Sequence, residues 1–160
     1  MGLSAAVTED DNETATDVVA PRPFRVLPAV GPDNEHFWLG GADGELRFLR
    51  CQACRHWIHP PSPICPMCLG RDVAPEAVSG RGTVFTYTVN WQPWLPNFDP
   101  PYVVAIVALP EQDSFRLTTN IVGCAPDDVH IGMAVEVEFE DYDGVWLPYF
   151  HPVDAAHPAP

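Results

Sequence analysis

The second half of the chain alternates between apolar and polar residues with the period of β-strands. In the segment 134–140, Val135, Val137 and Phe139 alternate with three glutamates, so one face is apolar and the other is charged. The segment 101–109 is an almost continuous apolar run, from which we predict a strand buried on both faces. Together the pattern predicts five strands, at residues 83–89, 101–109, 114–122, 134–140 and 145–150.

The turns between these strands narrow the choice of fold. Residues 141–144 (Asp-Tyr-Asp-Gly) have the composition of a tight hairpin turn, and a turn-rich insert, 123–132, separates the third strand from the fourth. Five antiparallel strands with an insert after the third are the outline of an OB-fold barrel, although strand spacing alone would also fit another small barrel. The predicted class is therefore mainly β.

The first 43 residues lack this pattern. Residues 1–20 are polar and acidic, which is typical of a disordered tail or linker, and the proline-rich stretch that follows is expected to be extended. Residues 33–39 predict a short helix with Asp33 as its N-cap and Gly40 and Gly41 at its end. Three large apolar residues of this helix either cap the core or dock on a partner, namely Phe37, Trp38 and Leu39.

Two Cys-x-x-Cys pairs organise the middle of the chain. Ten residues, 55–64, separate the pairs, and two such knuckles facing each other form the tetrahedral thiolate cage of structural zinc sites. The predicted metal ligands are Cys51, Cys54, Cys65 and Cys68. Two disulfides, four free thiols or iron in the same cage are the alternatives, of which disulfides do not suit a reducing cytoplasm. The fifth cysteine, Cys124, is interpreted as a buried structural thiol.

Composition and charge exclude some functions. The 160 residues contain no apolar run long enough to span a membrane and no N-terminal signal pattern, so we expect a cytoplasmic protein. The net charge is −14, there is no lysine, and only the region 44–82 has more basic than acidic residues. A nucleic-acid binder needs a basic stripe, so the charge argues against nucleic acid as the main partner. Nor does the sequence contain a recognisable catalytic motif.

One loop carries an unusual amount of apolar surface. The segment 90–102, between the first two barrel strands, combines four prolines with large apolar side chains. Such a loop often frames a ligand in OB-folds, although its rings could instead cap the end of the barrel. We assign several of these residues to a surface that binds a partner or acyl-CoA, together with two residues of the helix and one at the start of the barrel. The assigned residues are Phe37, Trp38, Arg81, Trp91, Trp94, Leu95, Phe98 and Tyr102.

These pieces occur in a recognisable order between Phe37 and Pro152: FW before a glycine, DGELRFLRCQAC, CPMC, SGRGTVFTYTV, PYVVAIVAL, TNIVGCAPDDVHIGMAVEVEFE and GVWLPYFHP. In this order the chain resembles the acyl-CoA-associated family that joins a rubredoxin-like zinc ribbon to an OB-fold. The domains expected are a disordered tail or linker (1–20), an extended or helical docking segment (21–43), the ribbon (44–79), the OB-fold (80–154) and a C-terminal tail (155–160).

The resemblance implies an accessory subunit, or an excised hydratase-subunit domain, without catalytic residues of its own. Its implied partners are thiolases, sterol-carrier-protein-x-type thiolase-like aldolases and MaoC-type hydratases, several of which act in bacterial steroid side-chain breakdown. The complex would take a CoA thioester as its substrate, plausibly for retro-aldol cleavage of a steroid-CoA. The alternatives are a nucleic-acid-binding OB module and a stand-alone acyl-CoA carrier that binds phosphates through Arg47, Arg50, Arg55, Arg71 or Arg81.

Overall fold

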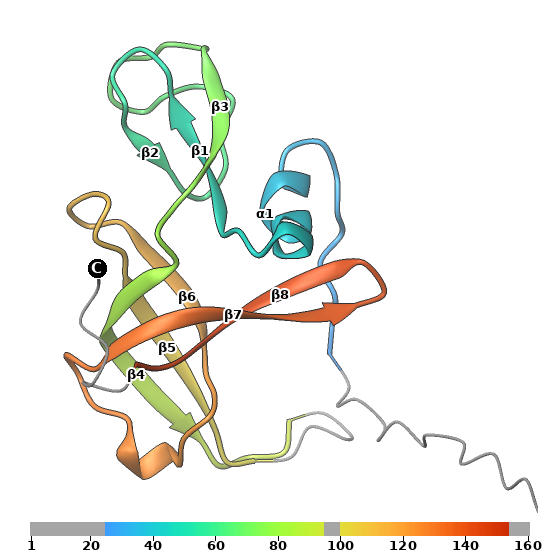
Figure 1. Cartoon of the computed structure of the whole chain (residues 1–160), viewed down its shortest axis with the longest axis vertical. Helices are drawn as coiled ribbons and strands as arrows, with labels where there is room; N and C mark the ends of the chain where they lie inside the picture. Colours follow the sequence, from blue (N-terminus) through green and yellow to red (C-terminus); the bar gives the residue numbers. More distant parts are fainter. Residues whose placement is uncertain (1–24, 95–99, 154–160) are drawn as a thin grey trace, which may run out of the picture.

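The computed structural model describes residues 25–94 and 100–153, and it places a small sheet above a closed barrel (Figure 1). One short helix lies beside both. The upper part comprises α1 (Glu35–Leu39), the 3-10 helix η1 (Gly40–Asp43), β1 (Arg47–Cys51), β2 (Trp57–Ile58) and β3 (Val73–Ala77). The barrel comprises β4 (Arg81–Asn90), β5 (Tyr102–Ala108), β6 (Arg116–Ile121), the 3-10 helix η2 (Pro126–Asp128), β7 (Ala134–Tyr142) and β8 (Val145–Pro152).

The predicted mainly β class and five-stranded OB-fold barrel are confirmed. The barrel closes in the order β4-β5-β6-β8-β7, with antiparallel neighbours except at the seam between β6 and β8. That seam is a single parallel pair, Ile121 with Phe150. The predicted hairpin turn is also present, because Asp143 and Gly144 both have positive φ, as a two-residue turn between twisted strands requires.

The prediction that 101–109 is buried on both faces is wrong. Burial alternates along β5, and Val103, Ala105 and Val107 are at most 2% exposed. The other side chains of the strand are only half-buried: Tyr102, Val104, Ile106 and Ala108. A barrel encloses one face of each strand, and nothing in the described part of the chain covers the second face of β5.

The helix and the ribbon differ from the prediction in detail. The helix begins after Asn34 rather than Asp33, and the Asn34 side chain forms no capping hydrogen bond with the helix; it accepts one from the preceding Gly31 N–H group instead (2.8 Å). As predicted, the α-helix ends before the two glycines, with Gly40 as its C-cap; the chain then continues into the 3-10 helix η1 and reverses at Gly44. The strands β2 and β3, which the pattern did not predict, flank β1 on either side.

Aromatic side chains join the helix, the ribbon and the barrel into one core. Phe48 of β1 contacts Phe37 of α1 (ring centroids 5.3 Å apart) and Phe115 of the barrel (4.8 Å). Trp57 of β2 stacks on the same Phe115 at 5.8 Å. The ribbon is therefore fixed to the barrel by buried contacts.

The predicted tails at 1–20 and 155–160 lie outside the described residues, as do Leu95 and Phe98 of the loop after β4. Among the helices of the described ranges, none is long and apolar enough to cross a membrane.

Candidate functional site

The four cysteines of the two knuckles come together at the end of the ribbon. Each knuckle is a tight turn in which the backbone N–H after the second cysteine returns to the first cysteine's carbonyl, from Arg55 to Cys51 (2.9 Å) and from Leu69 to Cys65 (3.0 Å). Both of these donors have a positive φ, of 65° and 61°. The turns aim all the sulfur atoms at one point.

The geometry of this cluster fits a structural zinc ion. The Sγ atoms of Cys51 and Cys68 are 3.6 Å apart, those of Cys54 and Cys65 are 3.5 Å apart, and all four lie within 4.8 Å of one another. A Zn–S bond of about 2.3 Å in a tetrahedron requires Sγ–Sγ distances of about 3.8 Å. Backbone N–H groups of Cys54 and Ala53 lower the pKa of the Cys51 thiol to about 7, which favours the thiolate that binds metal.

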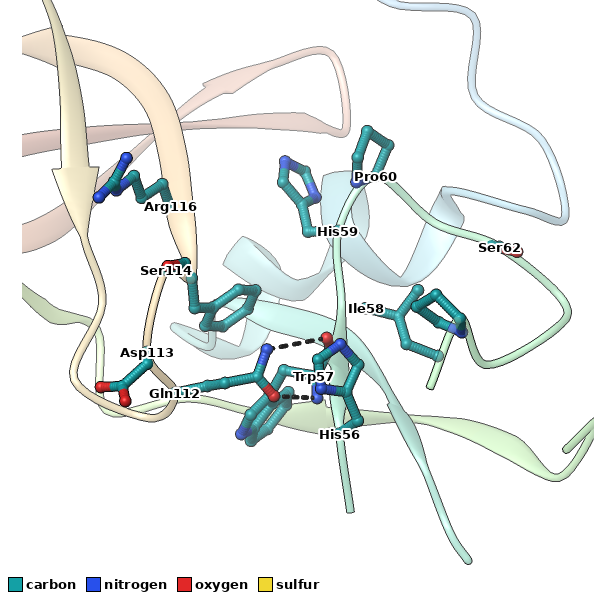
Figure 2. A pocket seen from close by; sticks show the side chains of 12 residues that line it. His56, Trp57, Ile58, His59, Pro60, Ser62, Gln112, Asp113, Ser114 and Arg116 are labelled. Atoms are coloured by element: carbon teal, nitrogen blue, oxygen red, sulfur yellow. Dashed lines mark hydrogen bonds between the residues drawn. The ribbon is translucent and has the colours of Figure 1, made fainter. Parts of the chain in front are cut away.

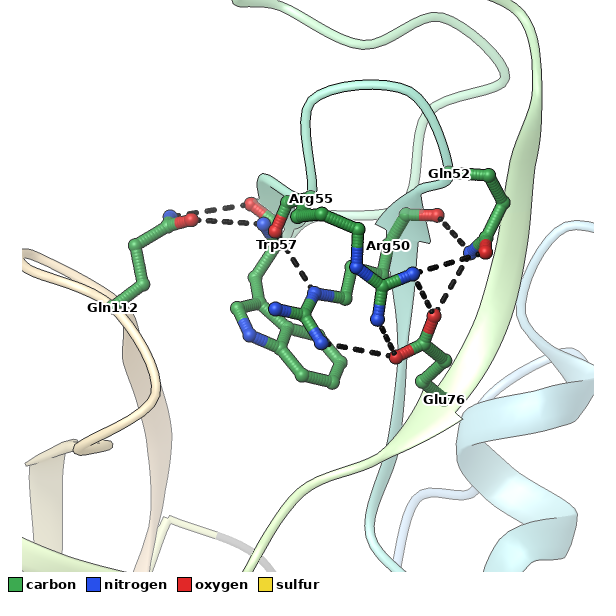
Figure 3. A network of polar contacts seen from close by, with 6 residues as sticks. All are labelled: Arg50, Gln52, Arg55, Trp57, Glu76 and Gln112. Atoms are coloured by element: carbon green, nitrogen blue, oxygen red, sulfur yellow. Dashed lines mark hydrogen bonds and ion pairs between the residues drawn. The ribbon is translucent and has the colours of Figure 1, made fainter.

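A polar network supports the ribbon beside this cluster (Figure 3). Glu76 of β3 accepts hydrogen bonds from Gln52 (2.9 Å), from both terminal nitrogens of Arg55 (2.8 Å each) and from Arg50 (3.1 Å). These donors, with Gln52 the strongest, lower the pKa of the Glu76 carboxyl to about 2. The Arg50 guanidinium also lies over the Trp57 ring, 4.5 Å from its centroid.

One side chain of the barrel forms hydrogen bonds with the backbone of the ribbon. Gln112, in the loop between β5 and β6, accepts a hydrogen bond from the Trp57 N–H (2.8 Å) and donates one to the Trp57 carbonyl (3.3 Å) (Figure 2). This pairing copies the two hydrogen bonds of a neighbouring strand. Gln112 and Trp57 line a cavity of about 470 Å³ between the ribbon and the barrel. A second cavity, of about 610 Å³, has three lining residues in common with the first: His59, Pro60 and Arg116.

The structure separates the residues predicted for a binding surface into two groups. Phe37 is buried (8% exposed) and Trp38 is half-buried against the core, so these two rings cap the core of the chain itself. Trp91 and Trp94, in contrast, are 65% and 71% exposed and do not cap the barrel. Tyr102 is half-buried at the start of β5.

Arginines proposed to bind phosphates are mostly paired with acids. Arg81 lies 3.7 Å from Glu136, and Arg47 contacts both Asp43 (2.7 Å) and Glu45 (2.8 Å). Since Glu76 holds Arg50 and Arg55, four of the five candidates have carboxylate partners. This pairing counts against a phosphate site built from them.

Cys124 is half-buried and packs against the core, where burial and then the Asp128 carboxylate raise the pKa of its thiol. A raised pKa disfavours a nucleophilic thiolate, in agreement with a structural role. Sequence reasoning missed Gln112 and Glu76, whose roles depend on residues far away in the chain and leave no local signal.

Two family models match the chain in succession. Residues 38–74 match the model described as "ChsH2, rubredoxin-like zinc ribbon domain", and residues 75–140 match "ChsH2, C-terminal OB-fold domain". The chain is also similar to a solved structure described as "Ltp2-ChsH2(DUF35) aldolase". The TM-score is 0.72 and the identity 39%, and the match covers 79% of this chain and 98% of the other.

Curated relatives include both long and short proteins. The chain is 40% identical over 133 residues to a probable enoyl-CoA hydratase alpha subunit of Thermomonospora curvata and 34% identical over 115 residues to the 3-oxo-4,17-pregnadiene-20-carboxyl-CoA hydratase alpha subunit of Mycobacterium tuberculosis. These matches cover 82% and 72% of this chain but only 41% and 36% of the two relatives.

A DUF35 domain-containing scaffold protein of Methanocaldococcus jannaschii is 38% identical over 115 residues, which are 66% of this chain and 80% of that protein. The chain therefore belongs to the DUF35 family, whose members join a ChsH2-type rubredoxin-like zinc ribbon to an OB-fold domain.

Proposed function

We propose that the chain is a non-catalytic, zinc-binding accessory subunit, or a domain of a hydratase subunit, that binds and activates a thiolase-like aldolase acting on acyl-CoA. The proposed reaction of the complex is retro-aldol cleavage of a steroid-CoA side chain. The observation that carries this proposal is the similarity to the Ltp2-ChsH2(DUF35) aldolase structure, which extends over 98% of that chain at 39% identity. The pregnadiene-carboxyl-CoA hydratase subunit among the relatives supports a steroid substrate.

The ribbon and the barrel form the kind of rigid unit that is suited to binding a partner protein. Zinc held by the four cysteines would fix both knuckles, and it would leave no open coordination position for a substrate. The buried contacts of Phe48 and Trp57 with Phe115, together with the Gln112 hydrogen bonds, make the ribbon and barrel a rigid unit. A rigid unit can bind a second protein without a large cost in ordering.

Copurification from the native cells tests this proposal. The tagged chain should be recovered in a stoichiometric complex with a thiolase-like protein identified by mass spectrometry, and with one zinc ion per chain. The purified complex should cleave a β-hydroxyacyl-CoA of steroid type, while the partner alone should be less active. Cleavage by the isolated chain, or a complex without any thiolase-like or MaoC-type protein, would overturn the assignment.

A stand-alone binding module for acyl-CoA or nucleic acid is the alternative. The paired arginines and the net charge of −14 oppose it, because both ligands are polyanions. Tight, salt-sensitive binding of CoA or an oligonucleotide by the isolated chain is the result that this alternative requires.

A further inference from the structure

The outer face of the first three barrel strands has an apolar centre, formed by Val104, Ile106 and Ala108 of β5, with uncharged polar residues on either side. Its rows follow the strand register: Thr86 pairs with Ile106 and Ile106 with Thr118, and in the next row Thr88 pairs with Val104 and Val104 with Asn120. We call this surface the β4–β6 outer face, and it consists of Thr86, Thr88, Val104, Ile106, Ala108, Thr118 and Asn120. All of these side chains are half-buried or exposed.

The strands under this face avoid negative charge. None of β4, β5 and β6 contains an aspartate or a glutamate, although the chain has 22 acidic residues. The neighbouring strand β7 contains four, in the sequence AVEVEFEDY. In a chain with a net charge of −14, a solvated barrel has no need to keep three adjacent strands free of acids, whereas a face that is covered by another molecule does.

The sequence of β5 supports the same conclusion. An apolar run such as YVVAIVA is typical of a strand that is covered on both faces. The chain itself covers the inner side with Val103, Ala105 and Val107, but it leaves Val104 and Ile106 half-buried. No residue of the described ranges covers that second side, which leaves it open to a partner.

One cation stands at the edge of this face. Arg116 of β6 is the only arginine or lysine between positions 83 and 160, which include eleven acids. Its guanidinium lies over the exposed Phe85 ring of β4, 3.4 Å from the centroid. The strand between them is β5, in which the small residue Ala108 pairs with Arg116. No carboxylate of the described residues forms an ion pair with it, so the stack holds a positive charge ready for an external anion.

Two exposed tryptophans extend the face at its other end. The Trp94 Nε1–H donates a hydrogen bond to the side chain of Asn90 (2.7 Å), the last residue of β4. With strands about 4.8 Å apart, the seven side chains of the face cover only about 250 Å², whereas a stable interface needs about 800 Å² on each partner. Trp91 and Trp94 provide part of the remaining contact area.

We propose that the β4–β6 outer face is the surface on which the thiolase-like partner binds, through an apolar patch of its own and a carboxylate opposite Arg116. This inference rests on the proposed function and adds the location of the interface. A second copy of the chain is disfavoured as the occupant, because it would bring together two chains that each carry a charge of −14.

The test measures binding of the purified thiolase-like partner to charge-insertion variants of the chain. Ile106→Glu places a carboxylate at the centre of the face, and Ile131→Glu is the matched control, because Ile131 is 67% exposed in the loop before β7. We expect Ile106→Glu to raise the Kd by about 30-fold or more, which is the effect of losing an interface hot spot. The Kd of Ile131→Glu should stay within about threefold of the wild-type value.

Two further variants separate binding from folding. Thr118→Arg changes an exposed side chain of the same row, so it should keep the melting temperature while weakening the Kd about tenfold or more. Arg116→Ala should weaken binding and reduce its dependence on salt, because it removes the proposed ion pair. Each variant is checked by thermal melting before its binding is measured.

The outcomes distinguish the two proposals. If the wild-type chain binds no thiolase-like protein, the proposed function fails and this inference fails with it. If the wild-type chain binds the partner and Ile106→Glu and Thr118→Arg bind equally well, the proposed function stands and the interface lies elsewhere. A chain that dimerises by itself, with Thr118→Arg restoring the monomer, would assign the face to a second copy instead.

Discussion

Replacing Phe115 by alanine should loosen the ribbon from the barrel. Phe115 is 4% exposed and contacts two aromatic rings of the ribbon, Phe48 at 4.8 Å and Trp57 at 5.8 Å. Removal of a fully buried phenylalanine costs about 3–5 kcal/mol in lost burial and in the cavity that remains. Since a domain of this size is stable by about 5–15 kcal/mol, the variant should lose a large part of its stability.

Urea unfolding, monitored by circular dichroism, gives the free energy of unfolding of the wild-type chain and of the Phe115→Ala variant. The control is Phe85→Ala, because Phe85 is 44% exposed and its main contact is the Arg116 guanidinium. Loss of that cation–π contact should cost about 0.5–1 kcal/mol. Equal effects of the two substitutions would refute the claim that the ribbon and the barrel share one core.

Three other predictions concern the metal cluster, the polar network and the barrel. Cys65→Ser should abolish stoichiometric zinc, measured by elemental analysis, and unfold the ribbon, since zinc contributes on the order of 10 kcal/mol in thiolate sites; Cys124→Ser should keep the zinc. Because Gln52 and two arginines hold the pKa of the Glu76 carboxyl at about 2, its stabilising effect should be complete above pH 4.5 and lost as the pH falls toward 2; a midpoint above 4 in an NMR titration would contradict the network. Gly82→Ala should cost about 1–3 kcal/mol in thermal unfolding, because a Cβ there would collide with Val107; a cost below about 0.5 kcal/mol would mean that the strand shifts freely.

Local patterns were sufficient for the metal cluster and the barrel. A Cys-x-x-Cys pair closes its own knuckle through local backbone bonds, so the ligand set can be read from spacing alone. Alternation in 134–140 and in 114–122 fixes which side chains face the core, because successive residues of a strand point to opposite faces. The two-residue turn before β8 is determined in the same way by Asp143 and Gly144.

The tertiary structure alone decided the burial of β5 and the support of the ribbon. An apolar run does not reveal whether one face or two will be covered by the same chain, and here Ile106 remains half-buried. Likewise, Gln112 meets Trp57 across 55 positions, and Glu76 meets Gln52 across 24. Such contacts arise from how the sheet and the barrel pack together, so no periodicity or motif along the chain can encode them.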